Sequence, residues 1–130
     1  MSAPTVPVRD VLAASEGMLQ KQLYVVFTRP RAGLAPVLEK IDAHLAYVVA
    51  AERKGQIFAA GPFWSDDERY WEGEGMMILR AASKAEAEEI AAGDPMHASG
   101  ARTYSVRPWL LNEGSLTIRL TYSDGASEVL

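Results

Sequence analysis

Residues 22–29 read QLYVVFTR, and this stretch carries the strongest information about the fold. β-Branched and aromatic residues dominate it, and such residues favour strands. Apolar side chains fill both of its alternating faces, a pattern typical of a central strand that is covered on both sides. Helices of the same chain can cover one face. The other face needs a second cover, which indicates that copies of the chain associate.

Further elements follow this strand in a regular order. We expect a helix over residues 34–54, because apolar side chains recur there at the i, i+3, i+4, i+7 spacing of one helix face. A second helix begins at Ser83, which forms a capping box with Glu86, and ends at Gly93. The other strands are expected at residues 56–62, 76–80 and 102–111. The resulting β-α-β-β-α-β order predicts an α+β, ferredoxin-like sandwich.

Both ends of the chain extend beyond this unit. Residues 1–21 form either a short amphipathic helix or, given their two prolines, a flexible arm or a segment docked on a partner. Apolar and polar residues alternate over 116–121, which predicts an added C-terminal strand paired with the preceding strand in a hairpin, followed by a loose tail. We therefore expect an N-terminal extension (1–21), a ferredoxin-like domain (22–111) and a C-terminal extension (112–130).

Composition excludes several classes of function. The 130 residues have room for one domain, and 48% hydrophobic and 23% charged residues are ordinary values for a globular protein. The net charge of −4 and the absence of a basic patch argue against nucleic-acid binding. The chain has no cysteine and two histidines, so we expect neither a metal site nor a cofactor. No apolar run suits a signal peptide or a membrane span, so we expect a cytoplasmic protein without a membrane partner.

His44 is the most informative single residue. Successive steps of 100° along the helix place it between Ile41 and Val48, at the edge of the apolar stripe, so its side chain should face the sheet. An imidazole in that place needs a hydrogen bond, because desolvation of an unpaired polar group is costly. It is either a structural histidine bonded to a backbone carbonyl or a general acid/base, since imidazole titrates near neutral pH.

Asp94 also has two interpretations. It directly precedes Pro95, and aspartate followed by proline at the first helical position is a common N-cap arrangement. The same carboxylate keeps free lone pairs with which it can orient an imidazole. His97 follows three residues later and is expected to be exposed.

The segment after the second strand offers candidates for a binding pocket. Pro62, Phe63 and Trp64 would form its rim, and Ser65 could contribute a hydroxyl, although no nucleophile-elbow motif surrounds it. Arg31, at the exit of the first strand, could receive a substrate carboxylate. Each has a plainer alternative as a chain break, a packed aromatic loop or a solvated loop residue.

Five stretches together resemble the YciI-like family over residues 22–109. They are LYVVF (23–27), DAHLAYV (42–48), KGQIFAAGP (54–62), SKAEAEEIAAGDP (83–95) and YSVRPW (104–109). The resemblance implies a homodimeric α+β barrel, in which two ferredoxin-like protomers press their sheets together. It also implies a histidine–aspartate pair at His44 and Asp94, and the Gly-Pro at a strand end of the family matches Gly61-Pro62. The chain differs from the family pattern in its N-terminal extension, its added C-terminal strand and its aromatic pocket loop.

Two classes of function follow from these observations. The first is a cofactor-independent lyase or isomerase for a small, ring-derived carbonyl acid, in which His44 moves a proton and Asp94 orients it. The resemblance supports this class, because relatives in the wider superfamily include muconolactone isomerases and dehydrochlorinases. The alternative is a non-catalytic ligand-binding or accessory protein. Both classes imply a small-molecule partner and a homodimer or larger homo-oligomer.

Overall fold

The computed structural model describes residues 4–130, which form two compact units. Residues 22–110 make up the larger unit, and the two chain ends together make up the smaller one. No helix within the described residues has the length and hydrophobicity needed to cross a membrane.

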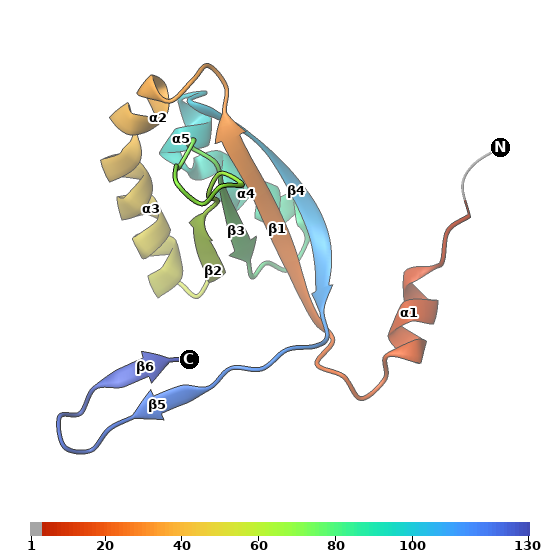
Figure 1. Cartoon of the computed structure of the whole chain (residues 1–130). Coiled ribbons are helices and arrows are strands. Elements are labelled where there is room, and N and C mark those ends of the chain that lie inside the picture. Colours follow the sequence, from red (N-terminus) through yellow and green to blue (C-terminus); the bar gives the residue numbers. More distant parts are fainter. Residues whose placement is uncertain (1–3) are drawn as a thin grey trace. The chain divides into compact units, whose positions relative to one another are not determined.

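The larger unit contains a four-stranded sheet with helices (Figure 1). The strands are β1 (Lys21–Pro30), β2 (Ile57–Pro62), β3 (Gly75–Leu79) and β4 (Arg102–Leu111). The helices are α2 (Ala35–Glu39), α3 (Ile41–Arg53), α4 (Lys84–Gly93) and α5 (Pro95–Ala98). The strand order is β2-β3-β1-β4, and β3 runs antiparallel to both β1 and β2. This arrangement confirms the α+β, ferredoxin-like class, with the expected first helix divided at Lys40 into α2 and α3.

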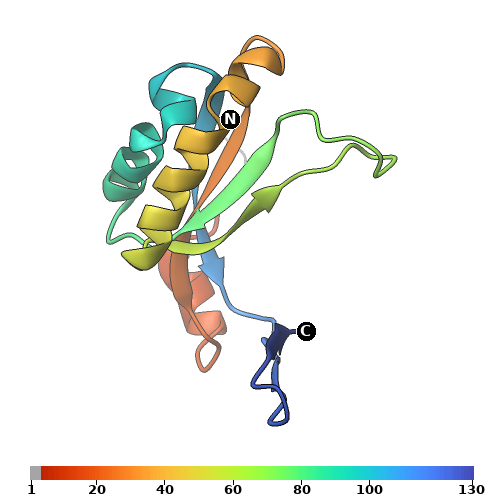
Figure 2. The ribbon, with the colours of Figure 1, turned by 90° about the vertical axis from the view of Figure 1, so that its left-hand side faces the viewer.

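The core lies between the sheet and the helices, which Figures 1 and 2 show on one side of the sheet. Tyr24 and Val26 of β1 are 8% and 0% exposed and pack with β3 and α4. Their burial follows from the period-2 alternation of strand side chains. The predicted cap of α4 is present, because the Ser83 side chain accepts a hydrogen bond from the backbone N–H of Glu86 (3.1 Å).

The smaller unit corrects the expectation for the C-terminus. Strand β5 (Ile118–Leu120) pairs antiparallel with β6 (Ser127–Val129), and not with β4. The pairing and the loose tail expected from the sequence are therefore wrong. The cause is turn chemistry: the Asp124 carboxylate accepts hydrogen bonds from the Thr121 hydroxyl and from the backbone N–H of Ala126, which closes a local hairpin. At the other end of the chain, the helical alternative is correct, with α1 at Val8–Ala14.

Candidate active site

His44 and Asp94 lie side by side although they are 50 residues apart in the sequence. The Nδ1 atom of His44, on α3, is 2.7 and 2.9 Å from the two carboxylate oxygens of Asp94. Asp94 is completely buried, and the His44 side chain is 16% exposed. A carboxylate only accepts hydrogen bonds, so Nδ1 of His44 carries the proton and donates it.

Asp94 is also the N-cap of α5. Its Oδ1 atom accepts a hydrogen bond from the backbone N–H of Met96 (2.9 Å) while the carboxylate holds His44. The two interpretations of Asp94 from the sequence thus describe one side chain with two simultaneous partners. The short helix α5 fixes the carboxylate in place, and the carboxylate in turn fixes the imidazole ring.

The second ring nitrogen of His44 is directed to open space. Within residues 4–130, Nε2 has no hydrogen-bond partner, and no buried side-chain nitrogen or oxygen atom is left unpaired. Nε2 is therefore accessible. With the proton on Nδ1, it carries a lone pair, which is the form in which imidazole acts as a base.

Tyr47 holds α3 against the end of α4 beside this pair. Its hydroxyl donates a hydrogen bond to the carbonyl of Ile90 (2.6 Å). Burial, and secondarily the negative charge of Asp94, raise the pKa of Tyr47, so the phenol stays a neutral donor. Gly93 leaves the necessary room, because a Cβ atom at this position would lie 2.6 Å from the Tyr47 hydroxyl oxygen.

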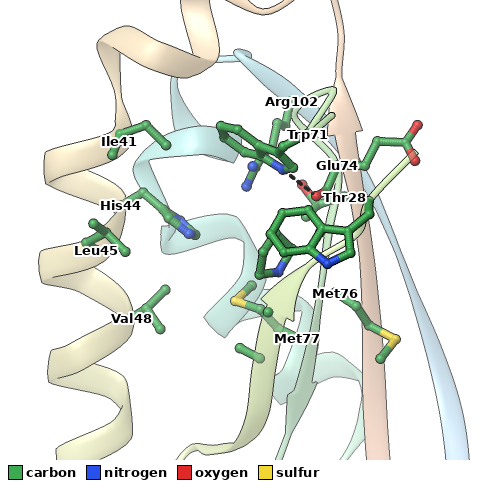
Figure 3. Close-up of a pocket in the computed structure, with 15 residues that line it drawn as sticks. Thr28, Ile41, His44, Leu45, Val48, Trp71, Glu74, Met76, Met77 and Arg102 are labelled. Carbon is green, nitrogen blue, oxygen red and sulfur yellow. Dashed lines mark hydrogen bonds between the residues drawn. The ribbon is translucent and has the colours of Figure 1, made fainter. Parts of the chain in front are cut away.

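A cavity of about 510 Å³ lies between α3 and the sheet (Figure 3). Figure 3 shows the His44 ring extending from α3 toward the sheet side of this cavity. Most of the wall is apolar. Its apolar members include Ile41, Leu45, Val48, Ala60, Pro62 and Met77. The size suits a small molecule, and the wall offers such a molecule mostly apolar contacts.

Arg102 is a cavity residue that sequence reasoning missed. It begins β4, is 5% exposed, and donates a hydrogen bond from Nε to the carbonyl of Gly73 (2.9 Å). Gly73 has φ +94°, and a Cβ there would lie 2.6 Å from the ring of Pro30, so glycine is required. Residues 102, 104 and 106 share one face of β4, and Val106 packs on the helix-side core. The alternation of β4 could therefore have revealed that Arg102 faces the helix side of the sheet.

Trp71 supports the guanidinium of Arg102. The indole ring centroid is 5.9 Å from the Cζ atom of Arg102, within cation–π range. The ring itself is fixed by a hydrogen bond from its Nε1 to the carbonyl of Glu74 (2.9 Å; Figure 3). Burial lowers the pKa of Arg102, but from a value so high that the group stays charged.

His97 is 9% exposed, so the expectation that it lies on the surface is wrong. The single turn of α5 directs the ring inward, where Nδ1 donates to the carbonyl of Ala91 (2.6 Å) and Nε2 is 2.8 Å from the hydroxyl oxygen of Thr28. The ring also stacks on Tyr104, with 4.1 Å between centroids. Burial lowers the pKa of His97 below its usual 6.5, so the ring is neutral and Nε2 accepts the proton of the Thr28 hydroxyl.

The buried neutral His97 predicts a loss of stability in mild acid. Between the folded pKa and 6.5, the unfolded chain binds more protons, so the contribution of His97 is complete above pH 6.5 and is lost as the pH falls toward the folded pKa. As the pH is lowered from about 8 to about 5, we expect the free energy of unfolding, measured by urea denaturation, to fall more steeply in the wild type than in His97→Gln. Parallel curves for the two proteins would contradict this account.

The candidates from the pocket loop separate into two groups. Pro62 and Trp64 line the cavity, whereas Phe63, Ser65 and Arg31 do not. The Ser65 hydroxyl donates to Asp67 (2.7 Å) and accepts from the backbone N–H of Tyr70 (3.1 Å), so it is used within its own turn. Arg31 is exposed in the loop after β1. Among the described residues, no three histidine, aspartate or glutamate side chains are grouped to hold a metal ion.

Comparison with known proteins gives a structural neighbour and a family. The neighbour is the 5-chloro-2-hydroxyhydroquinone dehydrochlorinase TftG from Burkholderia phenoliruptrix AC1100, solved in complex with 2,5-dihydroxybenzoquinone. The match has 22% identity and a TM-score of 0.51, and covers 67% of this chain and 92% of that chain, which shows a shared fold. No curated protein matches the sequence. The model of the YCII-related domain matches residues 22–110. The chain therefore belongs to the YCII-related domain family.

Proposed function

We propose that this protein is a small-molecule lyase or isomerase in which His44 is the general acid/base and Asp94 its orienting partner. One observation carries the proposal: buried Asp94 holds Nδ1 of His44 at 2.7 Å, and Nε2 is left free on a cavity of about 510 Å³. A base positioned next to an apolar substrate site is the arrangement that proton abstraction requires.

The proposed reaction begins when Nε2 of His44 removes a proton from a C–H or O–H group of the substrate. The imidazolium that forms is stabilised by the carboxylate of Asp94, whose attraction is strengthened because it is buried. In an isomerase, the same proton returns at another atom. In a lyase, the electron pair freed by deprotonation expels a leaving group. The chain's own groups suffice for either step, so the proposal includes no cofactor.

The neighbour supports an elimination on a hydroxylated ring. TftG is a dehydrochlorinase, and its structure holds a dihydroxybenzoquinone. In a dehydrochlorination, a base takes the proton and chloride departs with the bonding pair, so no oxidant or reductant is consumed. The proposed substrates of the present protein are therefore ring-derived acids or phenols that can form a carbonyl group.

The direct test is turnover of a small panel by the purified protein. We would incubate it with 5-chloro-2-hydroxyhydroquinone and with muconolactone, and would measure chloride release and proton exchange in D₂O by NMR. The proposal expects product formation or exchange above buffer and above a His44→Asn variant. Binding of panel compounds with neither turnover nor exchange would instead favour the alternative, a ligand-binding or accessory protein.

We also propose that the protein is a homodimer formed through the open face of the sheet. On the side away from the helices, Val25 stands opposite Ile78 and Phe27 opposite Met76. These residues line a second hollow of about 460 Å³ together with Trp109. Phe27 and Trp109 are 44% and 40% exposed, and a monomer rarely leaves such an apolar sheet face uncovered.

Light scattering after size-exclusion chromatography tests the dimer. The wild type should elute with at least twice the 14.2 kDa mass of one chain. Phe27→Asp places a charge in the sheet face and should shift the protein toward monomer. The matched control is Leu38→Asp, an exposed apolar position on α2 outside this face, which should leave the mass unchanged. A monomeric wild type would contradict the dimer.

A further inference from the structure

Arg102 carries a positive charge that is buried in the wall of the cavity. It is 5% exposed, and among the described residues it forms no salt bridge. Asp94, whose negative charge acts on Arg102, is already hydrogen-bonded by His44 and Met96. Glu74 also lines the cavity, but in Figure 3 its carboxylate is directed away from the guanidinium.

The free edge of the Arg102 guanidinium faces the cavity. Nε is used by the carbonyl of Gly73, and no other hydrogen bond of the group is formed within residues 4–130. Every buried side-chain nitrogen of the described residues has a hydrogen-bond partner, so the two Nη atoms, which have none, are not fully buried. Because Arg102 lines the cavity, these atoms are open toward it. The carbonyl of Gly73 fixes Nε, and the Trp71 ring lies within cation–π distance of the guanidinium, so the two Nη atoms form a positioned two-pronged donor.

We infer that Arg102 binds an anionic oxygen of the substrate, so that the substrate carries a carboxylate, phenolate or enolate group. The inference rests on the proposed function, according to which the cavity holds a substrate. It adds that this substrate is negatively charged. Burial of a guanidinium is costly unless a counter-ion arrives, and a bidentate anion supplies both charge and hydrogen bonds. Neutral analogues of the same shape leave this cost uncompensated.

Thr28 adds a second polar contact of known direction. Its hydroxyl proton is donated to Nε2 of neutral His97, so its oxygen presents only acceptor lone pairs. Thr28 is on β1, Arg102 on β4 and His44 on α3, and all three line the same cavity (Figure 3). The selected compound therefore carries a hydroxyl donor for Thr28 in addition to its anionic oxygen, as a hydroxylated aromatic or quinoid acid does.

Calorimetric titration with two matched probes tests this inference. One is 2,5-dihydroxybenzoate, which at neutral pH carries an anionic carboxylate and keeps its hydroxyl donors, and the other is its uncharged methyl ester. The wild type should bind the anion at least roughly 10-fold more tightly than the ester, as expected for a charge-assisted pair of hydrogen bonds. Arg102→Met should lose this preference. Thr28→Val should weaken binding of the anion by about 3- to 10-fold, the effect of one neutral hydrogen bond.

Controls separate this inference from the proposed catalysis. Arg31→Gln removes an exposed arginine outside the cavity and should keep the full preference for the anion. His44→Asn should also keep it, even though turnover is lost. The Arg102 side-chain NMR signals of the wild type provide a second readout that does not depend on the folding of Arg102→Met, and they should shift on titration with the anion. Equal wild-type affinity for the two probes, no binding of the anion, or unshifted Arg102 signals would overturn the inference.

Discussion

His44→Asn is expected to lower kcat by about 10²- to 10⁴-fold on any substrate that the panel identifies, because asparagine cannot accept a proton at neutral pH. The fold should persist, since asparagine can still donate a hydrogen bond toward Asp94 and the His44 side chain is only partly buried. The measurement is steady-state kinetics with a thermal melt of the same preparation. If kcat stays within about threefold of the wild type, His44 is not the base.

The matched control for this variant is Asp42→Asn. Asp42 lies on the same helix, on its exposed side, and outside the cavity. It should leave kcat and KM unchanged. An equal loss in both variants would point to a general effect on α3 and not to proton transfer.

Asp94→Asn is expected to cause a comparable loss, about 10²- to 10⁴-fold in kcat, through a different cause. The cap oxygen can remain on the N–H of Met96, so the amide nitrogen then faces Nδ1 of His44. Since that amide group donates, the imidazole must move its proton to Nε2, and the lone pair in the cavity disappears. Steady-state kinetics combined with urea denaturation should show a loss of rate with little change in stability.

Asp94→Ala separates the two roles of this carboxylate. It removes the cap as well as the partner of His44, so it should add a destabilisation of about 0.5–2 kcal/mol to the loss of rate. Asparagine is as good an N-cap as aspartate, and Asp94→Asn should therefore be the more stable variant. Wild-type rates in Asp94→Asn would show that the carboxylate is only a cap.

The sequence was sufficient for the elements whose periodicity is strong. The β-branched and aromatic residues of 22–29 led to the correct strand. The apolar stripe around His44 led to the correct helix and to the side of the helix from which His44 extends. The Asp-Pro pair at 94–95 led to the cap. These patterns involve residues that are close together in the sequence, and the folded chain keeps the local structure that they favour.

The features that the sequence analysis missed have three different physical causes. His97 lies on a helix of one turn, which is too short for a periodicity that would distinguish an inward from an outward position. Arg102 is charged, and charged residues are rarely buried, so its burial depends on Gly73 and Trp71 from a distant loop. The partner of β5 was decided by the turn at Asp124, which competes with pairing to β4.

The most direct test of the central claim is the ¹⁵N NMR spectrum of the His44 ring in the unmodified protein, recorded at a pH where the ring is neutral. The account predicts that Nδ1 carries the proton, held by Asp94, and that Nε2 has the chemical shift of an unprotonated nitrogen. Asp94→Asn should reverse the two signals. A proton on Nε2 in the wild type would contradict the account, because the cavity would then face a donor and not a base.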